Sequence, residues 1–236
     1  MPIGVIINAC SVLFGGIAGA LVGHKLSPKF KTEINLIFGV CSMGMGISTI
    51  GLMKNMPAVI FAIIIGTAIG LLLHLGDWIQ KGATFMQVFQ NNSDMNEEEF
   101  LTQLVTIIVL FCASGTGIYG SLTAGMTGDN SILISKSILD FFTAAIFACN
   151  LGYVVSIISI PQFLIFFVLF LCAGLIFPVT SPDMIADFKA CGGFLMLATG
   201  FRMVKLKNFP IADMIPAMII VMPLSYIWVT YIMALV

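Results

Sequence analysis

Three ionisable residues stand close together in a chain that is otherwise strongly apolar. Asp129, Lys136 and Asp140 occupy positions i, i+7 and i+11. On an α-helix this spacing places all three within roughly 40° of one face. A lysine flanked by two carboxylates is nearly self-neutralising, which lowers the cost of placing the group beside a cavity in a membrane. Such a stripe can bind a cation or a zwitterion, or relay a proton.

Asp140 is the best candidate for a coupling proton or cation, because it lies deepest in the apolar run. Asn130 stands beside Asp129 and is included as a candidate ligand. A second interpretation needs no site. If the membrane-spanning helix begins near Asp140, then Asp129 and Lys136 are interfacial residues whose side chains reach water. Both interpretations are open at the level of the sequence.

A segment rich in Gly, Ser and Thr precedes these charges. Its hydroxyl groups make Thr116 and Thr127 candidate ligands, and its many glycines permit an unwound backbone. Unwound backbone is tolerated at membrane depth only where it is buried in protein or lines water. The sequence is therefore compatible with two alternatives for residues 115–139, a re-entrant segment at the site or an extramembrane loop.

The composition identifies the solvent of this chain as lipid. Hydrophobic residues make up 59% of the 236 residues and charged residues only 9%, whereas a soluble domain carries roughly a quarter charged residues. Several apolar runs of about 20 residues match the length of a helix that crosses the hydrocarbon core. The prediction is an all-α, polytopic transmembrane helix bundle with about seven to eight spans. A net charge of −1 gives no electrostatic case for nucleic acid.

The predicted spans cover residues 3–23, 34–53, 58–75, 100–119, part of 130–160, 163–179, 185–203 and 211–235. In the first span, Gly15, Gly19 and Gly23 recur at intervals of four and predict a face on which another backbone packs closely. Asn8 lies in the same span and is a further candidate, since its amide can bond a neighbouring helix or line a cavity.

The order of the spans favours an internal repeat. Sliding the chain along itself moves Gly16 onto Gly174 and Lys31 onto Lys189, and pairs spans one to three with spans six to eight. Five helices separate equivalent positions, so the two units would face opposite ways, as in the inverted repeats of transporters. We predict a single transmembrane domain, residues 1–236, organised as a three-helix unit, a cytoplasmic loop, central spans with a polar break and a second three-helix unit (1–76, 77–99, 100–160 and 161–236).

The distribution of basic residues predicts the orientation in the membrane. The odd-numbered loops carry most of the cations, and the even-numbered loops carry Lys54, Lys189 and, depending on where the fifth span begins, Lys136. Because cytoplasmic loops are enriched in Lys and Arg, the odd loops are expected in the cytoplasm and both termini outside. The cations of the odd loops are Lys25, Lys29, Lys31, Lys81, Arg202, Lys205 and Lys207.

The sequence does not match the catalytic motifs of intramembrane enzymes. The run from Gly125 to Asp129 is one residue too long for the Gly-x-Gly-Asp pattern of intramembrane aspartyl proteases, and only His24 and His74 offer imidazole bases. The six cysteines occur singly, without a Cys-x-x-Cys pair, and are expected as small apolar fillers. We therefore expect no enzyme, no metal site and no cofactor.

Two stretches carry a family resemblance. INACSVLFGGIAG near the start, and TGDNSILISKSILD with its continuation TAAIFACNLG, closely resemble the YdfK/YqgA-like family of bacterial inner-membrane proteins. The most specific part runs from Gly128 and Asp129 through Lys136 to Asp140. The resemblance implies a location in the bacterial cytoplasmic (inner) membrane. It implies no activity, because the family has no assigned function.

The first functional hypothesis is a small secondary transporter or ion-translocating carrier with Asp129, Lys136 and Asp140 as its polar centre. The alternatives are an oligomeric channel lined by the same residues, and a non-transporting membrane scaffold or sensor in which they lock helices together. The expected partners are the lipid bilayer, a small solute or ion, and further copies of the chain in a homo-oligomer. No nucleic acid is expected.

Overall fold

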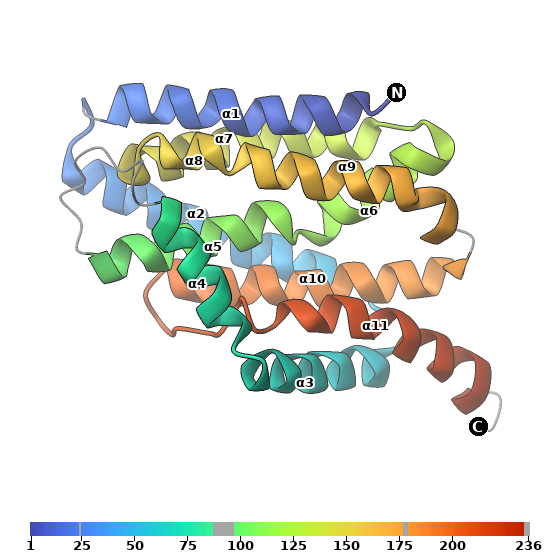
Figure 1. Cartoon of the computed structure of the whole chain (residues 1–236). Helices are drawn as coiled ribbons and strands as arrows, with labels where there is room; N and C mark the ends of the chain where they lie inside the picture. The colour runs from blue at the N-terminus through green and yellow to red at the C-terminus, as the bar shows by residue number, and fades with distance from the viewer. Residues whose placement is uncertain (24, 87–96, 177–178, 234–236) are drawn as a thin grey trace. The chain divides into compact units, whose positions relative to one another are not determined.

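The structure, a computed structural model, describes residues 1–23, 25–86, 97–176 and 179–233 (Figure 1). Seven of its helical segments are long and apolar enough to cross a membrane, and a bent pair of helices, α3 (Met56–Leu72) and α4 (Leu75–Met86), would make an eighth span. The predicted all-α bundle of seven to eight spans is thus confirmed. Residues 87–96 of the predicted cytoplasmic loop lie outside the described part.

The helices are α1 Ile3–Gly23, α2 Pro28–Ile50, α3 Met56–Leu72, α4 Leu75–Met86, α5 Glu97–Cys112, α6 Gly115–Thr127, α7 Ser131–Leu151, α8 Val154–Ile157, α9 Ser159–Ile176, α10 Pro182–Met203 and α11 Ile215–Ile227. Helix α11 continues as a π-helical turn, Trp228–Ile232.

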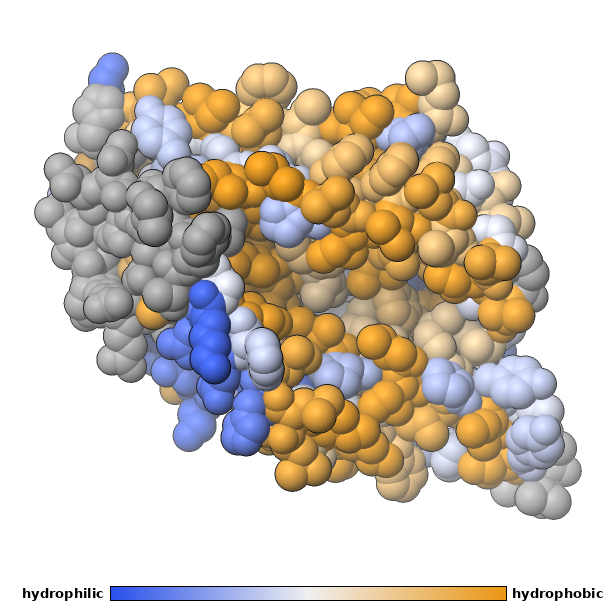
Figure 2. Space-filling model, viewed as in Figure 1, coloured by the Kyte–Doolittle hydropathy of each residue, from blue (hydrophilic) through white to orange (hydrophobic). Residues whose placement is uncertain are grey.

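The outer surface of the helices is apolar. On α9 the side chains of Leu164, Leu171 and Leu175 are exposed, the last of them by 80%, and Figure 2 shows hydrophobic residues over much of the visible face. Each Å² of apolar surface left in water costs about 25 cal/mol relative to burial. Exposure on this scale identifies lipid as the surroundings of these helices.

The chain divides into two compact units that are interleaved in sequence. Unit 1 consists of Met1–Phe38 and Ile79–Phe177, and unit 2 of Gly39–Trp78 and Pro178–Val236. Helix α2 contributes to both. The predicted inverted repeat, which would pair the first three spans with the last three, stays a prediction.

In unit 1, α1 lies along α7, with α8 and α9 on its flank (Figure 1). The predicted glycine face of α1 makes this contact. A β-carbon at Gly15 or Gly19 would overlap a carbonyl oxygen of α7, that of Phe141 or Ala145. The absence of side chains lets the two backbones touch, and dispersion contacts of this kind replace the hydrophobic effect as the force that joins helices in lipid.

The segment rich in Gly, Ser and Thr is a helix, and both structures predicted for it, an unwound re-entrant segment and an extramembrane loop, are wrong. Helix α6 begins at Gly115, where the side chain of Ser114 accepts a hydrogen bond from the backbone N–H of Gly117. Further along, the hydroxyl of Ser121 donates to the carbonyl one turn back. The small residues serve packing, because Gly125 lies against the backbone of Phe170 on α9.

The break after the fifth span also differs from the predicted spans, part of 130–160 and 163–179, which leave Pro161 and Gln162 as the connection between them. Helix α7 ends at Gly152, whose φ of 74° and ψ of −153° suit glycine. Pro161 instead lies in the first turn of α9, where a missing N–H leaves no helical hydrogen bond unmade. The consequence is that Gln162 points from a helix rather than from a connecting loop.

Unit 2 is organised around a second buried carboxylate, Asp187 on α10. One oxygen accepts hydrogen bonds from the backbone N–H groups of Lys54 and Asn55, at 2.8 and 2.9 Å. The other accepts from the side chains of Asn55 and Ser225, at 2.8 and 2.6 Å. Because Asn55 precedes the first turn of α3, Asp187 fixes the positive end of that helix to α10 and α11.

The α1–α7 contact gives a direct test. We expect Gly19→Ala to lower the free energy of unfolding by about 1–3 kcal/mol, because its methyl group must displace the backbone of α7. Gly174→Ala on α9 is the matched control, since nothing lies within 4 Å of a β-carbon there. Unfolding of the purified protein in mixed micelles measures both. Equal stability of the two variants would contradict the proposed close contact.

Candidate ion-binding site

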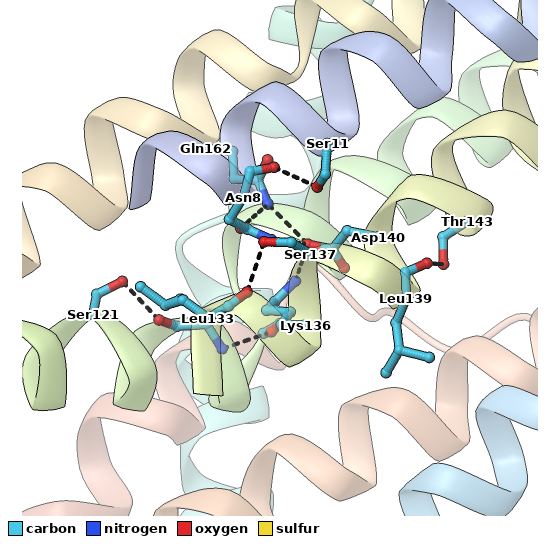
Figure 3. A network of polar contacts seen from close by, with 12 residues as sticks. Asn8, Ser11, Ser121, Leu133, Lys136, Ser137, Leu139, Asp140, Thr143 and Gln162 are labelled. Carbon is cyan, nitrogen blue, oxygen red and sulfur yellow. Dashed lines mark hydrogen bonds and ion pairs between the residues drawn. The ribbon is translucent and has the colours of Figure 1, made fainter. Parts of the chain in front are cut away.

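Four polar side chains from three helices of unit 1 meet in its apolar interior (Figure 3). Lys136 and Asp140 lie one turn apart on α7, Asn8 comes from α1 and Gln162 from α9. All four are buried, and Asp140 lies near the middle of its helix. Charged groups in such surroundings are costly unless they are paired and hydrogen-bonded.

Three donors converge on one carboxylate oxygen, Asp140 Oδ2. The ammonium of Lys136 forms an ion pair with it. The amide of Asn8 donates at 2.8 Å and that of Gln162 at 3.2 Å. Charge-assisted bonds of this type are stronger than those between neutral groups. The other oxygen, Oδ1, takes none of the three.

The amide of Gln162 is oriented by its neighbours. Its Nε2 donates to Asn8 Oδ1 at 2.9 Å as well as to Asp140 Oδ2. The reverse orientation would place the amide oxygen against two acceptors, so it is excluded. The oxygen Oε1 is therefore left over. It is buried and has no hydrogen-bond partner among the described residues.

The rest of the site is apolar and aromatic. The ammonium of Lys136 lies 5.9 Å from the ring centroids of Phe111 on α5 and of Phe166 on α9. Both distances are within the range at which a ring face attracts a cation. A β-carbon at Gly117 would lie 2.9 Å from the Lys136 side chain, so α6 closes the site tightly. The absence of a side chain at Gly117 makes room for the lysine.

Three of the seven residues that the sequence singles out meet in this cluster: Asn8, Lys136 and Asp140. Thr116 and Thr127 are exposed on α6, and the hydroxyl of Thr127 donates to the carbonyl of Thr123. These two threonines therefore lie outside the candidate site.

Asp129 and Asn130 also lie outside the cluster. The two residues precede α7, so Asp129 is not on the helical face that its spacing predicts. Asp129 is fully exposed, and the backbone N–H of Ser131 donates to its carboxylate, which holds the pKa of that group below its usual range. The side chain of Asn130 instead accepts a hydrogen bond from the backbone N–H of Gly4 at the start of α1, at 2.8 Å.

Gln162 is the member of the cluster that the sequence prediction missed. The available signal was a glutamine bounded on both sides by long apolar runs. The adjacent Pro161 predicts a connecting turn at this point, so the sequence assigns Gln162 to a loop and not to a membrane helix. A glutamine within a membrane helix commonly forms hydrogen bonds with a neighbouring helix, and here it bonds Asn8 and Asp140.

Metal chelation by several acidic, thiol or imidazole groups has no structural basis in the part of the chain that is described. No three His, Cys, Asp or Glu side chains gather there. The oxygens that the cluster offers are one carboxylate and two amide oxygens, together with a cation. This set suits a monovalent ion, a proton or a small polar solute better than a transition metal.

The helices and the buried ion pair define a multispanning membrane protein with a polar centre inside its apolar spans. The chain belongs to the family described as "Protein of unknown function (DUF554)", whose model matches residues 3–226. This result confirms the resemblance to YdfK and YqgA that two sequence stretches indicate.

Two relatives match along almost their full lengths. The "Uncharacterized protein YqgA" of Escherichia coli (strain K12) is 46% identical over 233 residues, 98% of this chain and 99% of the relative. The "Uncharacterized membrane protein YdfK" of Bacillus subtilis (strain 168) is 25% identical over 219 residues, 92% of this chain and 93% of the relative. No solved structure matches the chain. The name of the second relative agrees with the assignment of this chain to the membrane.

The buried pair predicts an asymmetry between single and double variants. Lys136→Met leaves the carboxylate of Asp140 buried without its cation, and we expect it to lower the free energy of unfolding by about 3–5 kcal/mol. The double variant Lys136→Met with Asp140→Asn carries no charge in the site and should recover much of this loss. Unfolding in mixed micelles, arranged as a double-mutant cycle, measures the coupling.

Asp129→Asn is the control, because that side chain is exposed, and its unfolding should match that of the unaltered protein. Additive losses in the double variant would show that Lys136 and Asp140 do not interact.

Proposed function

We propose that the protein is a secondary carrier that translocates an ion or a small solute, with Asp140 as the group that binds the coupling proton or cation. The observation that carries the proposal is the ion pair of Lys136 and Asp140, buried near the middle of a membrane-spanning helix. A purely structural span has no need of charge at such a position. Intramembrane ionisable groups mark ion and proton pathways in many transporters.

The hydrogen bonds around Asp140 fit this role. Three donors hold Oδ2, whereas Oδ1 receives none of these bonds and remains available to a proton or cation. The amides of Asn8 and Gln162 keep the carboxylate in one orientation. Binding at Oδ1 changes the charge of the pair without first breaking the contacts that join α1, α7 and α9.

The other parts of the proposal come from the sequence. Reaction with a substrate has no support in any catalytic motif, so the proposed role is transport and not catalysis. The distribution of Lys and Arg favours the odd loops in the cytoplasm and both termini outside. Membership of a family with relatives in two bacteria supports a location in the bacterial cytoplasmic membrane.

Proteoliposomes containing a trapped pH indicator test the proposal. We apply gradients of alkali and ammonium salts and of neutral amino acids, and record the internal pH and the uptake of labelled solute. A carrier should give saturable flux for at least one solute. Asp140→Asn should lower this flux by at least about tenfold, which corresponds to 1.4 kcal/mol.

Asp129→Asn, outside the cluster, should keep the flux of the unaltered protein. Flux that persists in both Asp140→Asn and Lys136→Met would remove the site from the transport path. Flux that rises linearly with concentration would favour the channel. The absence of flux for every solute, together with loss of stability in the variants, would favour a scaffold in which the cluster only joins helices.

A further inference from the structure

A turn with three cations lies at the C-terminal end of α10, in unit 2. Arg202 stands in the last turn of the helix, and Lys205 and Lys207 follow within five residues. Residues 188–212 contain no Asp or Glu. Helix α10 has 22 residues and is about 33 Å long, which is close to the thickness of the hydrocarbon core. Residues 202–209, called the basic turn below, are therefore expected at the level of the lipid headgroups.

The backbone of the basic turn is held by its own hydrogen bonds. Helix α10 ends in a Schellman motif, in which the N–H of Leu206 donates to the carbonyl of Phe201 at 3.0 Å. The N–H of Lys205 donates to the carbonyl of Arg202, also at 3.0 Å, and Lys205 has the left-handed φ of 57° that this motif requires. These backbone groups satisfy the carbonyls of Phe201 and Arg202. The guanidinium of Arg202 is thus not needed to cap its own helix.

Arg202 is a half-buried cation without a counter-charge in the part of the chain that is described. Its Nε is buried and has no hydrogen-bond partner, and the guanidinium forms no ion pair there. The next carboxylate along the chain, that of Asp213, instead accepts a hydrogen bond from the backbone N–H of Gly76 at 2.8 Å. A charge that is taken out of water without a partner is costly. An anion from outside the chain would satisfy the guanidinium.

Apolar side chains are exposed beside these cations. Leu206 lies between Lys205 and Lys207 in the sequence and is 69% exposed. The residue at its place in a Schellman motif often packs against the preceding helix. Here the ring of Phe209 contacts Phe201 instead, at 5.9 Å between centroids, and Leu206 is left to the surroundings. Cations at headgroup level beside an apolar side chain suit an anionic amphiphile.

We propose that the basic turn binds the phosphate group of an anionic phospholipid, with Arg202 as the bidentate donor, Lys207 as a second cation and Leu206 against the acyl chain. A guanidinium presents two parallel N–H groups that match two phosphate oxygens. Free phosphate shares this chemistry, but it gives the exposed Leu206 no partner. The distribution of Lys and Arg predicts this end of α10 on the cytoplasmic side, where anionic lipids create a negative surface potential.

Lipid titration of the full-length, delipidated protein in dodecyl maltoside tests the proposal, with native mass spectrometry to count the bound molecules. We expect one phosphatidylglycerol per chain at this site, with an apparent Kd at least about tenfold below that of phosphatidylcholine. Sodium phosphate is titrated in a parallel series. Equal affinity for the two lipids would overturn the proposal. Displacement of phosphatidylglycerol by millimolar phosphate would assign the site to the free anion instead.

Charge variants locate the site. Arg202→Gln should raise the Kd for phosphatidylglycerol at least about tenfold, and Lys207→Gln about fivefold, the effect of one cation near a membrane surface. Arg202→Lys should lie between the unaltered protein and Arg202→Gln, because it keeps the charge but lacks the planar fork. Lys29→Gln is the matched control, since that lysine is exposed in unit 1 and on the same predicted side of the membrane. Equal losses in Lys29→Gln and Arg202→Gln would show attraction to the net charge and not to a site.

Thermal unfolding separates lipid binding from a structural role of Arg202. Without lipid, Arg202→Gln should unfold at about the same temperature as the unaltered protein, and phosphatidylglycerol should stabilise only the unaltered protein. A variant that is destabilised without lipid, yet gains as much from phosphatidylglycerol, would overturn the proposal. Because Lys207 is exposed, Lys207→Gln keeps the test valid even if Arg202→Gln does not fold. None of these measurements depends on the carrier function.

Discussion

The low dielectric constant of the membrane interior is the constraint on which this structure depends. A carboxylate there must find donors or a cation, and the protein meets this demand in two ways. In unit 1, Asp140 is paired with Lys136 and accepts two side-chain amides. In unit 2, Asp187 accepts hydrogen bonds from the backbone N–H groups of Lys54 and Asn55 just before α3, from the side chain of Asn55 and from the hydroxyl of Ser225. Each arrangement joins three elements.

The two carboxylates differ in whether they can accept a further proton or cation. Four donors surround Asp187, two on each oxygen, so an added proton or cation would have to displace one of them. Around Asp140 all three donors share one oxygen, and the amide oxygen of Gln162 nearby is left over. Fully satisfied polar networks fix a structure, whereas a buried polar group without a partner calls for an explanation such as a functional role or a bound water or ion. This difference is why we place the function at Asp140 and assign Asp187 an anchoring role.

The close contact of α1 and α7 gives the cluster its geometry. Asn8 reaches Asp140 because Gly15 and Gly19 bring the two backbones together further along the same helices. Gln162 reaches both Asn8 and Asp140 because the chain turns at Gly152, ten residues before Gln162, and α9 then runs back along α1. The polar network thus depends on residues that carry no functional group. Glycine in this protein controls distance, and distance determines which polar groups meet.

The sequence by itself determined the membrane class, most of the spans, the glycine face of α1, and Asn8, Lys136 and Asp140 as candidates, because hydropathy, small-residue spacing and isolated charge are local properties. The tertiary structure alone decided three further points: that residues 115–127 form a helix, that Asp129 and the two threonines lie apart from the pair, and that Gln162 joins it. Each of these depends on which helix packs alongside, since a neighbour decides whether a glycine-rich segment stays helical and which side chain a carboxylate meets. No periodicity within one segment contains that information.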